Sequence, residues 1–272
     1  MDDESVYALG YTQREAKRLE WQAQLSEEFL EDGLRRGGLA RGMRVLDLGS
    51  GLGDVAFLAA AMVGPEGAVV GIDRWAPSLD TARSRAAERG LANVKFIHAD
   101  LESFEIEDEF DAVIGRFIMQ YLPYRSELLA RLKKNLIPGG RVIFQEVDNS
   151  AATEIPPSEL FSKARTWIAS AFQATGSVHD MGSLLPRTFL DAGLPRPQMI
   201  SMGRVESGPD TPFYDFLTEV LRSLLPVLKK TGAVDVGAID IETLADRLRD
   251  DAVAHDRTLY SARVVTAWAK IG

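Results

Sequence analysis

Residues 43–53 have the sequence Met-Arg-Val-Leu-Asp-Leu-Gly-Ser-Gly-Leu-Gly, an apolar run followed by a glycine turn. This D-x-G-x-G-x-G pattern predicts a buried strand, a tight turn and a helix that begins near Asp54. Alternate glycines allow positive φ angles and leave room for a ligand against bare main chain. The pattern differs from G-x-G-x-x-G, in which a helix N-terminus receives anionic oxygens. Asp47 instead puts a carboxylate at the strand end, which favours a cationic or amine-bearing ligand.

Four further apolar runs follow this turn, and polar or amphipathic segments separate them. The first of the four ends in Asp73, 20 residues after Gly53, where an acid can accept hydrogen bonds from ribose hydroxyls. Strands that alternate with amphipathic helices predict a mainly parallel sheet with helices on both faces. The four runs are residues 69–73, 94–98, 110–116 and 140–146.

Taken in order, the five strand segments resemble the class I S-adenosylmethionine (SAM)-dependent methyltransferases. The resemblance implies an α/β, Rossmann-like fold: a seven-stranded, mostly parallel sheet with helices on both faces and a helical cap. It also implies a final antiparallel strand inserted beside the fifth. SAM is the implied cofactor, with Asp73 at the ribose, Asp100 at the adenine amino group and the main-chain N–H of Leu101 at the ring. The same resemblance places Asp47 near the methionyl amino group.

Two other stretches resemble bacterial small-molecule methyltransferases related to the ubiquinone/menaquinone-biosynthesis C-methyltransferases. One is residues 180–186, Asp-Met-Gly-Ser-Leu-Leu-Pro. The other lies near the N-terminus and consists of Tyr7-x-Leu9-Gly10 with Glu15, Arg18-Leu19 and Gln22 behind it. Because those relatives act on varied small molecules, the resemblance defines the cofactor better than the acceptor.

The predicted site therefore contains two groups of residues. Those expected to contact the cofactor are Asp47, Gly49, Ser50, Gly51, Gly53, Asp73, Arg74, Asp100, Leu101, Arg116 and Gln22. Those expected to contact the acceptor are Tyr7, Trp21, Gln120 and Tyr121. Simpler explanations stay open for several of them: Asp47 as a brace for the turn, Arg116 as an ion-pair residue and Gln22 as a surface amide.

Methyl transfer from a sulfonium is an in-line displacement, so the protein aligns the reactants, excludes water and, for a weak acceptor, removes a proton. The candidate bases are Glu146, at the end of the fifth strand, and His179, in a predicted cap segment. Of these we favour Glu146. His98 and His255 are better explained as a strand-end residue and a solvated helix residue. No set of histidines and acids has metal-ligand spacing, so no metal is predicted.

The chain is long enough for one domain with additions. We expect an N-terminal helical cap segment at residues 1–40, a SAM-binding core at 41–150 and a cap or lid insertion at 151–181. Residues 182–272 are expected to complete the core, with a helical insertion at about 209–256 and a C-terminal strand. A further strand is expected at residues 198–205.

Composition narrows the class of protein. A net charge of −9 and a pI of about 5.0 argue against a surface that follows nucleic-acid phosphates. The absence of cysteine excludes disulfides and thiolate catalysis. The acidic start Met1-Asp2-Asp3-Glu4 is unlike a signal peptide, and no apolar run approaches the roughly 20 residues that span a bilayer. We expect a cytoplasmic protein without a membrane span or a nucleic-acid partner.

The leading hypothesis is a SAM-dependent methyltransferase that modifies a carbon, oxygen or nitrogen of a small apolar or aromatic metabolite. One alternative is a nucleotide-dependent oxidoreductase, which the glycine spacing opposes. Another is a SAM-binding regulator without turnover, which intact cofactor motifs do not exclude. A homodimer and a monomer are both compatible with the sequence.

Overall fold

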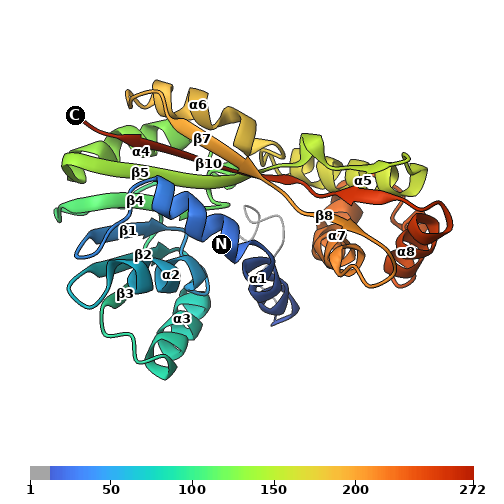
Figure 1. The fold of residues 1–272 in the computed structure, drawn as a ribbon, viewed down its shortest axis with the longest axis horizontal. Helices are drawn as coiled ribbons and strands as arrows, with labels where there is room; N and C mark the ends of the chain where they lie inside the picture. The colour runs from blue at the N-terminus through green and yellow to red at the C-terminus, as the bar shows by residue number, and fades with distance from the viewer. Residues whose placement is uncertain (1–12) are drawn as a thin grey trace. The chain divides into compact units, whose positions relative to one another are not determined.

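The computed structural model describes residues 13–272, which form two compact units. The first, here called the core unit, consists of Leu25–Glu146, Met181–Ser201 and Val264–Gly272. The second, the helical unit, consists of residues 13–24, Val147–Asp180 and Met202–Arg263. Helix α1 (Gln13–Arg36) contributes to both units. Figure 1 shows the elements of each unit.

The core unit contains a seven-stranded sheet with the order β3-β2-β1-β4-β5-β10-β7. β1 pairs in parallel with β2 and β4, and the pairs β2–β3 and β4–β5 are parallel too. The carboxyl ends of β1, β2, β4 and β5 therefore meet at one edge, where open α/β sheets bind ligands. The strands are β1 (Arg44–Leu48), β2 (Ala68–Asp73), β3 (Val94–His98), β4 (Phe110–Arg116), β5 (Leu136–Asp148), β7 (Gln198–Met202) and β10 (Arg263–Lys270).

The strand β10 lies between β5 and β7 and runs against β5. Ile271, just after β10, donates its main-chain N–H to the carbonyl of Gly140 near the start of β5, at 2.9 Å. Further along β5, the Gln145 side chain donates to Thr266 Oγ1 of β10 at 2.8 Å. Residue numbers that rise on one strand while they fall on the other define an antiparallel pair. The predicted seven-stranded, mostly parallel sheet with an antiparallel strand beside the fifth is confirmed.

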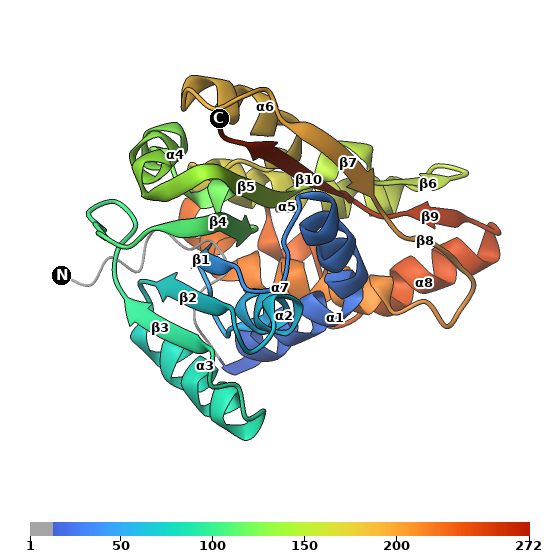
Figure 2. The same ribbon diagram turned by 60° about the vertical axis from the view of Figure 1, so that its left-hand side comes forward.

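Helices cover both faces of this sheet. Ile143 of β5 belongs to an apolar cluster with Leu34 of α1 and Ala59 of α2 (Asp54–Val63). The next residue, Phe144, meets the ring of Phe189 in α6 (Met181–Asp191) edge-on, with centroids 6.5 Å apart. Because successive strand residues point to opposite faces, α2 and α6 lie on opposite sides of the sheet. Helix α3 (Ala76–Glu88) packs on β2 and β3, and α4 (Arg125–Leu132) lies beside α6 (Figures 1 and 2).

The helical unit packs α5 (Glu159–Ala174) on α7 (Phe213–Thr231), and α7 on α8 (Leu244–Ala254). Ser158 begins α5 as an N-cap: its hydroxyl accepts the N–H of Phe161 at 3.1 Å and donates to Asp251 at 2.6 Å. A small antiparallel sheet has the order β6-β9-β8, from Thr153–Ile155, Thr258–Tyr260 and Val205–Ser207.

One sequence expectation about the strands is wrong. The segment 198–205, expected as a single strand, is divided between β7 in the seven-stranded sheet and β8 in the small sheet. The break falls at Gly203 and Arg204, where the Arg204 N–H donates to Ser261 Oγ at 2.9 Å instead of to a neighbouring strand. The expected division into cap and core segments at 1–40, 41–150, 151–181 and 182–272 stays a prediction.

Candidate functional site

The glycine turn after β1 has positive φ angles at Gly49, Gly51 and Gly53, of 69°, 51° and 89°. The three glycines differ in what surrounds them. A Cβ atom built on Gly49 or on Gly53 would lie 2.6 Å from Ile118 or Phe57, respectively. A Cβ on Gly51 would meet no described atom within 4 Å. Close packing therefore requires glycine at the outer two positions, whereas Gly51 leaves open space beside the main chain.

Asp73, at the end of β2, holds this turn from the neighbouring strand. Its Oδ2 accepts the N–H of Gly51 and its Oδ1 accepts the N–H of Trp75, both at 2.9 Å. Burial raises the pKa of Asp73, and these main-chain hydrogen bonds oppose the rise. Each carboxylate oxygen keeps a further lone pair, so the same side chain can accept hydroxyl groups of a ligand.

Asp47, at the penultimate position of β1, is fully buried. Within residues 13–272, neither of its carboxylate oxygens has a hydrogen-bond donor. Burial raises its pKa well above the usual value, and the nearby Arg116 guanidinium opposes that rise. A buried carboxylate without a donor costs several kcal/mol unless it is neutralised. Asp73 braces the turn by accepting the N–H of Gly51, whereas Asp47 accepts no hydrogen bond within the described residues and can therefore receive a cation.

Arg116 ends β4 and is half-buried. It donates to Ser26 Oγ at 3.5 Å, and its guanidinium lies 5.6 Å from the centre of the Phe117 ring. Burial lowers the pKa of Arg116, while the charges of Asp54 and Asp47 raise it. The Asp47 carboxyl group and the Arg116 guanidinium are thus held at the carboxyl ends of the adjacent strands β1 and β4.

The predicted adenine region follows β3. Asp100 is exposed, and its Oδ1 accepts the N–H of Glu102 at 2.9 Å. Leu101 is buried, and its carbonyl accepts a hydrogen bond from Arg131. His98 Nε2 lies 2.9 Å from the carbonyl of Arg74, so His98 fixes the main chain that follows Asp73. In the parallel pairing of β2 with β3, Asp73 lies opposite His98.

Glu146, near the end of β5, is fully buried. Its Oε1 accepts two main-chain N–H groups, from Ile118 at 2.9 Å and from Met119 at 2.8 Å. Burial raises the pKa of Glu146 to about 8. Its Oε2 has no hydrogen-bond partner within the described part of the chain.

The segment after β4, which Glu146 holds, contains two of the predicted acceptor residues. Gln120 is buried, and its Nε2 donates to the carbonyl of Phe117 at 3.1 Å. Tyr121 is half-buried and ends a short 3₁₀ helix, Met119–Tyr121. Phe117 has a φ of 54°, which is uncommon for a bulky residue and recurs at functional sites.

Ser50, in the glycine turn of the core unit, is buried. The predicted residues Gln22, Trp21 and His179 belong to the helical unit, and Tyr7 lies outside the described residues. The side chain of Gln22 accepts a hydrogen bond from Arg18 at 2.8 Å. His179 stacks edge-on against Phe172 at 5.5 Å, and its Nδ1 lies 3.3 Å from Asp180 Oδ1. Burial lowers the pKa of His179. This histidine is therefore disposed to be neutral, the form in which an imidazole can accept a proton.

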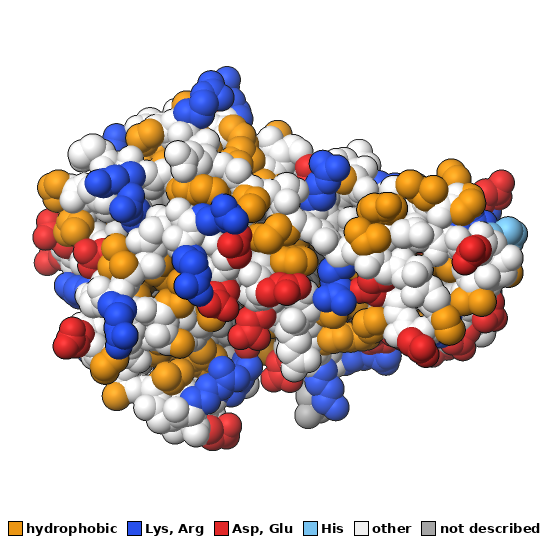
Figure 3. All heavy atoms as spheres, viewed as in Figure 1, with side chains coloured by type: hydrophobic (Ala, Val, Ile, Leu, Met, Phe, Trp, Pro, Cys, Tyr) orange, Lys and Arg blue, Asp and Glu red, His pale blue; other side chains and the backbone are white. Residues whose placement is uncertain are grey.

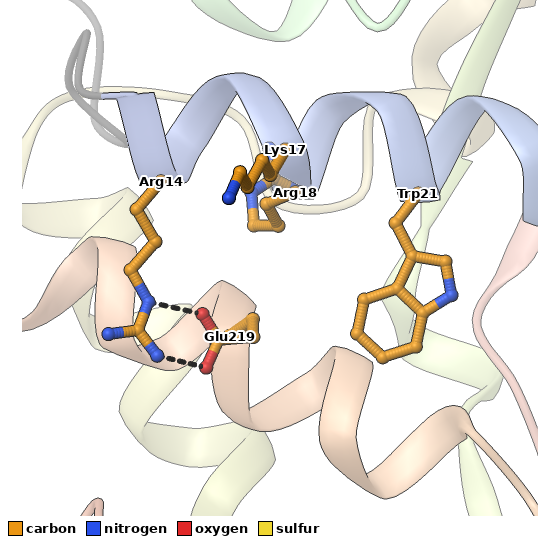
Figure 4. A pocket seen from close by; sticks show the side chains of 5 residues that line it. All are labelled: Arg14, Lys17, Arg18, Trp21 and Glu219. Atoms are coloured by element: carbon orange, nitrogen blue, oxygen red, sulfur yellow. Dashed lines mark hydrogen bonds and ion pairs between the residues drawn. The ribbon is translucent and has the colours of Figure 1, made fainter.

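Trp21 lines a pocket between α1 and α7 in the helical unit (Figure 4). The pocket has a volume of about 430 Å³. Arg14 closes one end by a bidentate ion pair to Glu219, at 2.6 and 2.7 Å. The Trp21 indole meets the ring of Phe216 edge-on, with centroids 5.6 Å apart. The other lining residues are Lys17 and Arg18.

The core unit thus brings together the predicted residues of the glycine turn, Asp47, Asp73, Arg116 and Glu146 at one sheet edge. Sequence reasoning missed two residues that support this edge. Arg85 of α3 donates to the carbonyl of Leu52 and to Asp54, both at 2.7 Å, and Ile118 packs on Gly49. Neither contact has a local sequence signal, because each joins segments more than 30 residues apart.

Other kinds of site have little support in the structure. Residues 13–272 contain no group of three or more histidines and acids that could hold a metal ion. No helix in this range is long and apolar enough to cross a membrane. On the face seen in Figure 3, basic, acidic and apolar side chains are interspersed. Such a surface gives no support to phosphate tracking along nucleic acid.

Two observations fit a cationic methyl donor. The buried Asp47 carboxylate has no donor among the described residues, and Gly51 opens onto space that a Cβ atom would occupy. A sulfonium cofactor with an amino group and a ribose matches the charge at Asp47 and the acceptor at Asp73. The residues present therefore fit SAM.

Comparisons with known proteins agree with this geometry. A family model described as "Methyltransferase domain" matches residues 39–188. The arsenite methyltransferase of Aquipseudomonas alcaligenes is 35% identical over 147 residues, 50% of this chain and 42% of that protein. The ubiquinone/menaquinone biosynthesis C-methyltransferase UbiE of Stutzerimonas stutzeri is 34% identical over 129 residues, 47% of this chain and 48% of that protein. The match thus spans about half the length of the curated relatives.

Solved structures share the fold. A SAM-dependent methyltransferase from Aquifex aeolicus has a TM-score of 0.54 at 22% identity, covering 72% of this chain and 93% of that one. Phosphoethanolamine N-methyltransferase 2 of Haemonchus contortus, in complex with SAM, has a TM-score of 0.53 at 23% identity, covering 90% of this chain and 52% of that one. The predicted Rossmann-like fold and SAM as the cofactor are confirmed. With the family model matching more than half of its length, the chain belongs to the methyltransferase-domain family.

Proposed function

We propose that this protein transfers the methyl group of SAM to a small, apolar or aromatic metabolite. The observation that carries the proposal is the buried Asp47 carboxylate without a donor in the described chain, beside a glycine turn that opens at Gly51. When bound, SAM supplies an electrophilic methyl group on a sulfonium. The contribution of the chain is to hold the donor, align the acceptor and exclude water.

Each predicted residue has a role in this proposal. Asp47 neutralises the methionyl amino group, and Asp73 accepts the ribose hydroxyls while it holds Gly51. Asp100 and the main-chain N–H of Leu101 contact adenine. Arg116 contacts the methionine end, and Gly49, Ser50, Gly53 and Arg74 shape the walls of the cofactor site through their main chain. Gln22 stays a prediction from the sequence.

The acceptor class rests on the aromatic residues and on the relatives. Trp21 meets Phe216 edge-on in the helical unit, and aromatic side chains favour apolar or aromatic ligands. The other residues that line the Trp21 pocket are charged. The relatives are named for arsenite and for quinone biosynthesis, two unlike acceptors, and each aligns over about half its length. We therefore propose a small acceptor that contacts Gln120 and Tyr121 in the core unit and leave the acceptor atom open among carbon, oxygen and nitrogen. Trp21 stays a prediction from the sequence.

If the acceptor is a carbon or a weak acid, a base is required, and His179 suits that role because its pKa is lowered. The sequence favours Glu146 as the base. In the structure its Oε1 is engaged by two main-chain N–H groups, and a different role for Glu146 is developed below. A cytoplasmic location and a homodimer stay predictions from the sequence.

The proposal is tested in two steps. Calorimetry with SAM and, separately, with NAD should show binding of SAM alone. Incubation with SAM and a panel of quinols, phenols, amines and arsenite, followed by mass spectrometry, should then show a product 14 mass units heavier, the gain of one CH₂ (roughly 14 Da) that a transferred methyl brings. Binding of NAD but not SAM would overturn the proposal in favour of an oxidoreductase. Tight SAM binding with no product over the whole panel would indicate a regulator.

A further inference from the structure

Glu146 holds the backbone that follows β4. Its Oε1 lies 2.9 Å from the Ile118 nitrogen and 2.8 Å from the Met119 nitrogen, and the side chain is fully buried. The two N–H groups are consecutive and begin a 3₁₀ turn, so no carbonyl within that turn can accept both of them. One carboxylate oxygen on β5 thus fixes the start of the turn.

The same turn places Ile118 against the glycine turn of β1. A Cβ atom built on Gly49 would lie 2.6 Å from Ile118 Cδ1 and 2.8 Å from its Cγ1. On the other side, a Cβ built on Gly115 would lie 3.0 Å from Ile118 Cγ2. The Ile118 side chain therefore fills the space that two glycines leave free, and it supports the main chain just ahead of Gly51.

These contacts form a continuous sequence across three strands: Glu146 on β5, Ile118 after β4, and Gly49 after β1. We propose that Glu146 is a positioning residue that sets the glycine turn for SAM through Ile118. This inference rests on the proposed function, because it concerns the affinity for SAM. It assigns Glu146 a mechanical role in cofactor binding in place of proton transfer.

The geometry favours positioning over base catalysis. A general base must come within hydrogen-bond reach of the proton that it removes, whereas Glu146 has no exposed surface. The adjoining Phe117 has a φ of 54°, and such a conformation persists only where the surroundings hold it. The N–H of Phe117 donates to the carbonyl of Gln145 at 2.9 Å, so Gln145 and Glu146 together hold three consecutive residues.

The test compares three substitutions by calorimetry with SAM and with its product, S-adenosylhomocysteine. Glu146→Gln keeps an oxygen that can accept both N–H groups, so its Kd should stay within about threefold of the wild type. Glu146→Ala leaves two buried donors without an acceptor and should raise both Kd values about tenfold or more. Ile118→Val removes Cδ1, the atom nearest Gly49, and should raise Kd by about threefold or more, with Glu146 untouched.

Coupling supplies a second criterion. If Glu146 acts through Ile118, the double variant Glu146→Ala/Ile118→Val should raise the Kd for SAM by less than the product of the two single-variant fold-changes. Glu154→Ala is the matched control, because Glu154 is also a buried carboxylate, bonded to the Tyr214 hydroxyl at 2.7 Å in the helical unit. Its Kd for SAM should equal that of the wild type. Near-ultraviolet circular dichroism identifies any variant that does not fold. If Glu146→Ala does not fold, Ile118→Val still tests the proposal.

The outcomes separate the two proposals. Unchanged SAM affinity in folded Glu146→Ala and in Ile118→Val would overturn the positioning role and leave the proposed function standing. A Glu146→Gln variant with normal Kd but a kcat lowered about 100-fold or more would instead identify a base. Failure of the wild type to bind SAM would overturn both the proposed function and this inference.

Discussion

Gly51 differs from its neighbours in the glycine turn because nothing in the described chain packs against it. A side chain there would cost the fold only the strain of a positive φ. The backbone conformation therefore favours glycine at this position, and a ligand in the open space adds a second reason for it. The carboxylate of Asp73 accepts the N–H of Gly51, so it lies beside the same open space.

The first prediction is that Gly51→Ala lowers SAM affinity at least about tenfold, because its methyl group occupies the open space of the site. Strain at φ > 0 costs the fold about 1 kcal/mol. Gly90→Ala is a matched control: Gly90 has a φ of 66° and equally open surroundings, but it lies after α3. Urea unfolding should show similar losses of stability for the two variants, and calorimetry should show a loss of SAM binding for Gly51→Ala alone. Equal SAM affinities would mean that the turn is not the cofactor site.

The second prediction concerns Asp73. Asp73→Ala removes both the ribose acceptor and the Gly51 contact, and should weaken SAM binding by more than about 1.4 kcal/mol, or tenfold. Asp111→Ala is the control, since Asp111 also accepts a main-chain N–H, from Arg44 at 2.7 Å, at the opposite end of the strands. A folded Asp73→Ala variant with wild-type affinity in calorimetry would exclude Asp73 from the site.

At the scale of elements, β5 carries a buried acid whose proton should affect stability. Burial raises the pKa of Glu146 from 4.5 to about 8. Between these values the unfolded chain has released the proton that the folded chain keeps. Stability therefore falls as the pH rises through this window, by at most about 1.4 kcal/mol per pH unit, and the dependence ends above the folded pKa.

The third prediction follows from that sign. Glu146→Gln cannot ionise, so the unfolding free energy of the wild type should fall relative to that of Glu146→Gln between pH 5 and pH 8. Urea unfolding of both proteins at four pH values in this range measures the difference, and the common titrations of other groups cancel. Curves that run parallel would show that Glu146 is ionised in the folded protein throughout.

Elements with strong local signals were predictable from the sequence. The strands from β1 to β5 and the helices α5 to α8 follow apolar periodicity, and some have clear boundary residues, such as the capping Ser158 before α5 and Pro212 and Gly232 around α7. The small sheet was not predictable, because its strands have three residues each and form only with distant partners. Asp47 and Asp73 were identified by motif, but the contact of Ile118 with Gly49 depends on the pairing of β1 with β4 and has no local signature.

At the scale of the whole molecule, each of the two units is assembled from three separate segments of the chain. Neither unit corresponds to a continuous stretch that could be expressed alone. Helix α1 contributes residues to both units.

The fourth prediction concerns residues 13–30 and 150–180. If these segments close over bound SAM to exclude water, they should become protected from hydrogen exchange when SAM or its product is added. Mass spectrometry of peptides from α1 and α5 measures this, with peptides from α8 as a reference. Protection confined to the strands of the core unit would mean that the two segments do not act as a lid.

The place of β10 between β5 and β7 has a consequence for the folding reaction. More than a hundred residues separate β5 from β10, so their pairing closes a long loop, a step that slows folding. Until that step, the β5 edge, with Ile143 and Phe144 beside it, is open to pairing with other chains. Refolding should therefore be slower than for a helical protein of this size and should lose yield to aggregation as protein concentration rises. Variants that weaken the pairing of β10 should refold with a lower yield, even where they leave the binding of SAM intact.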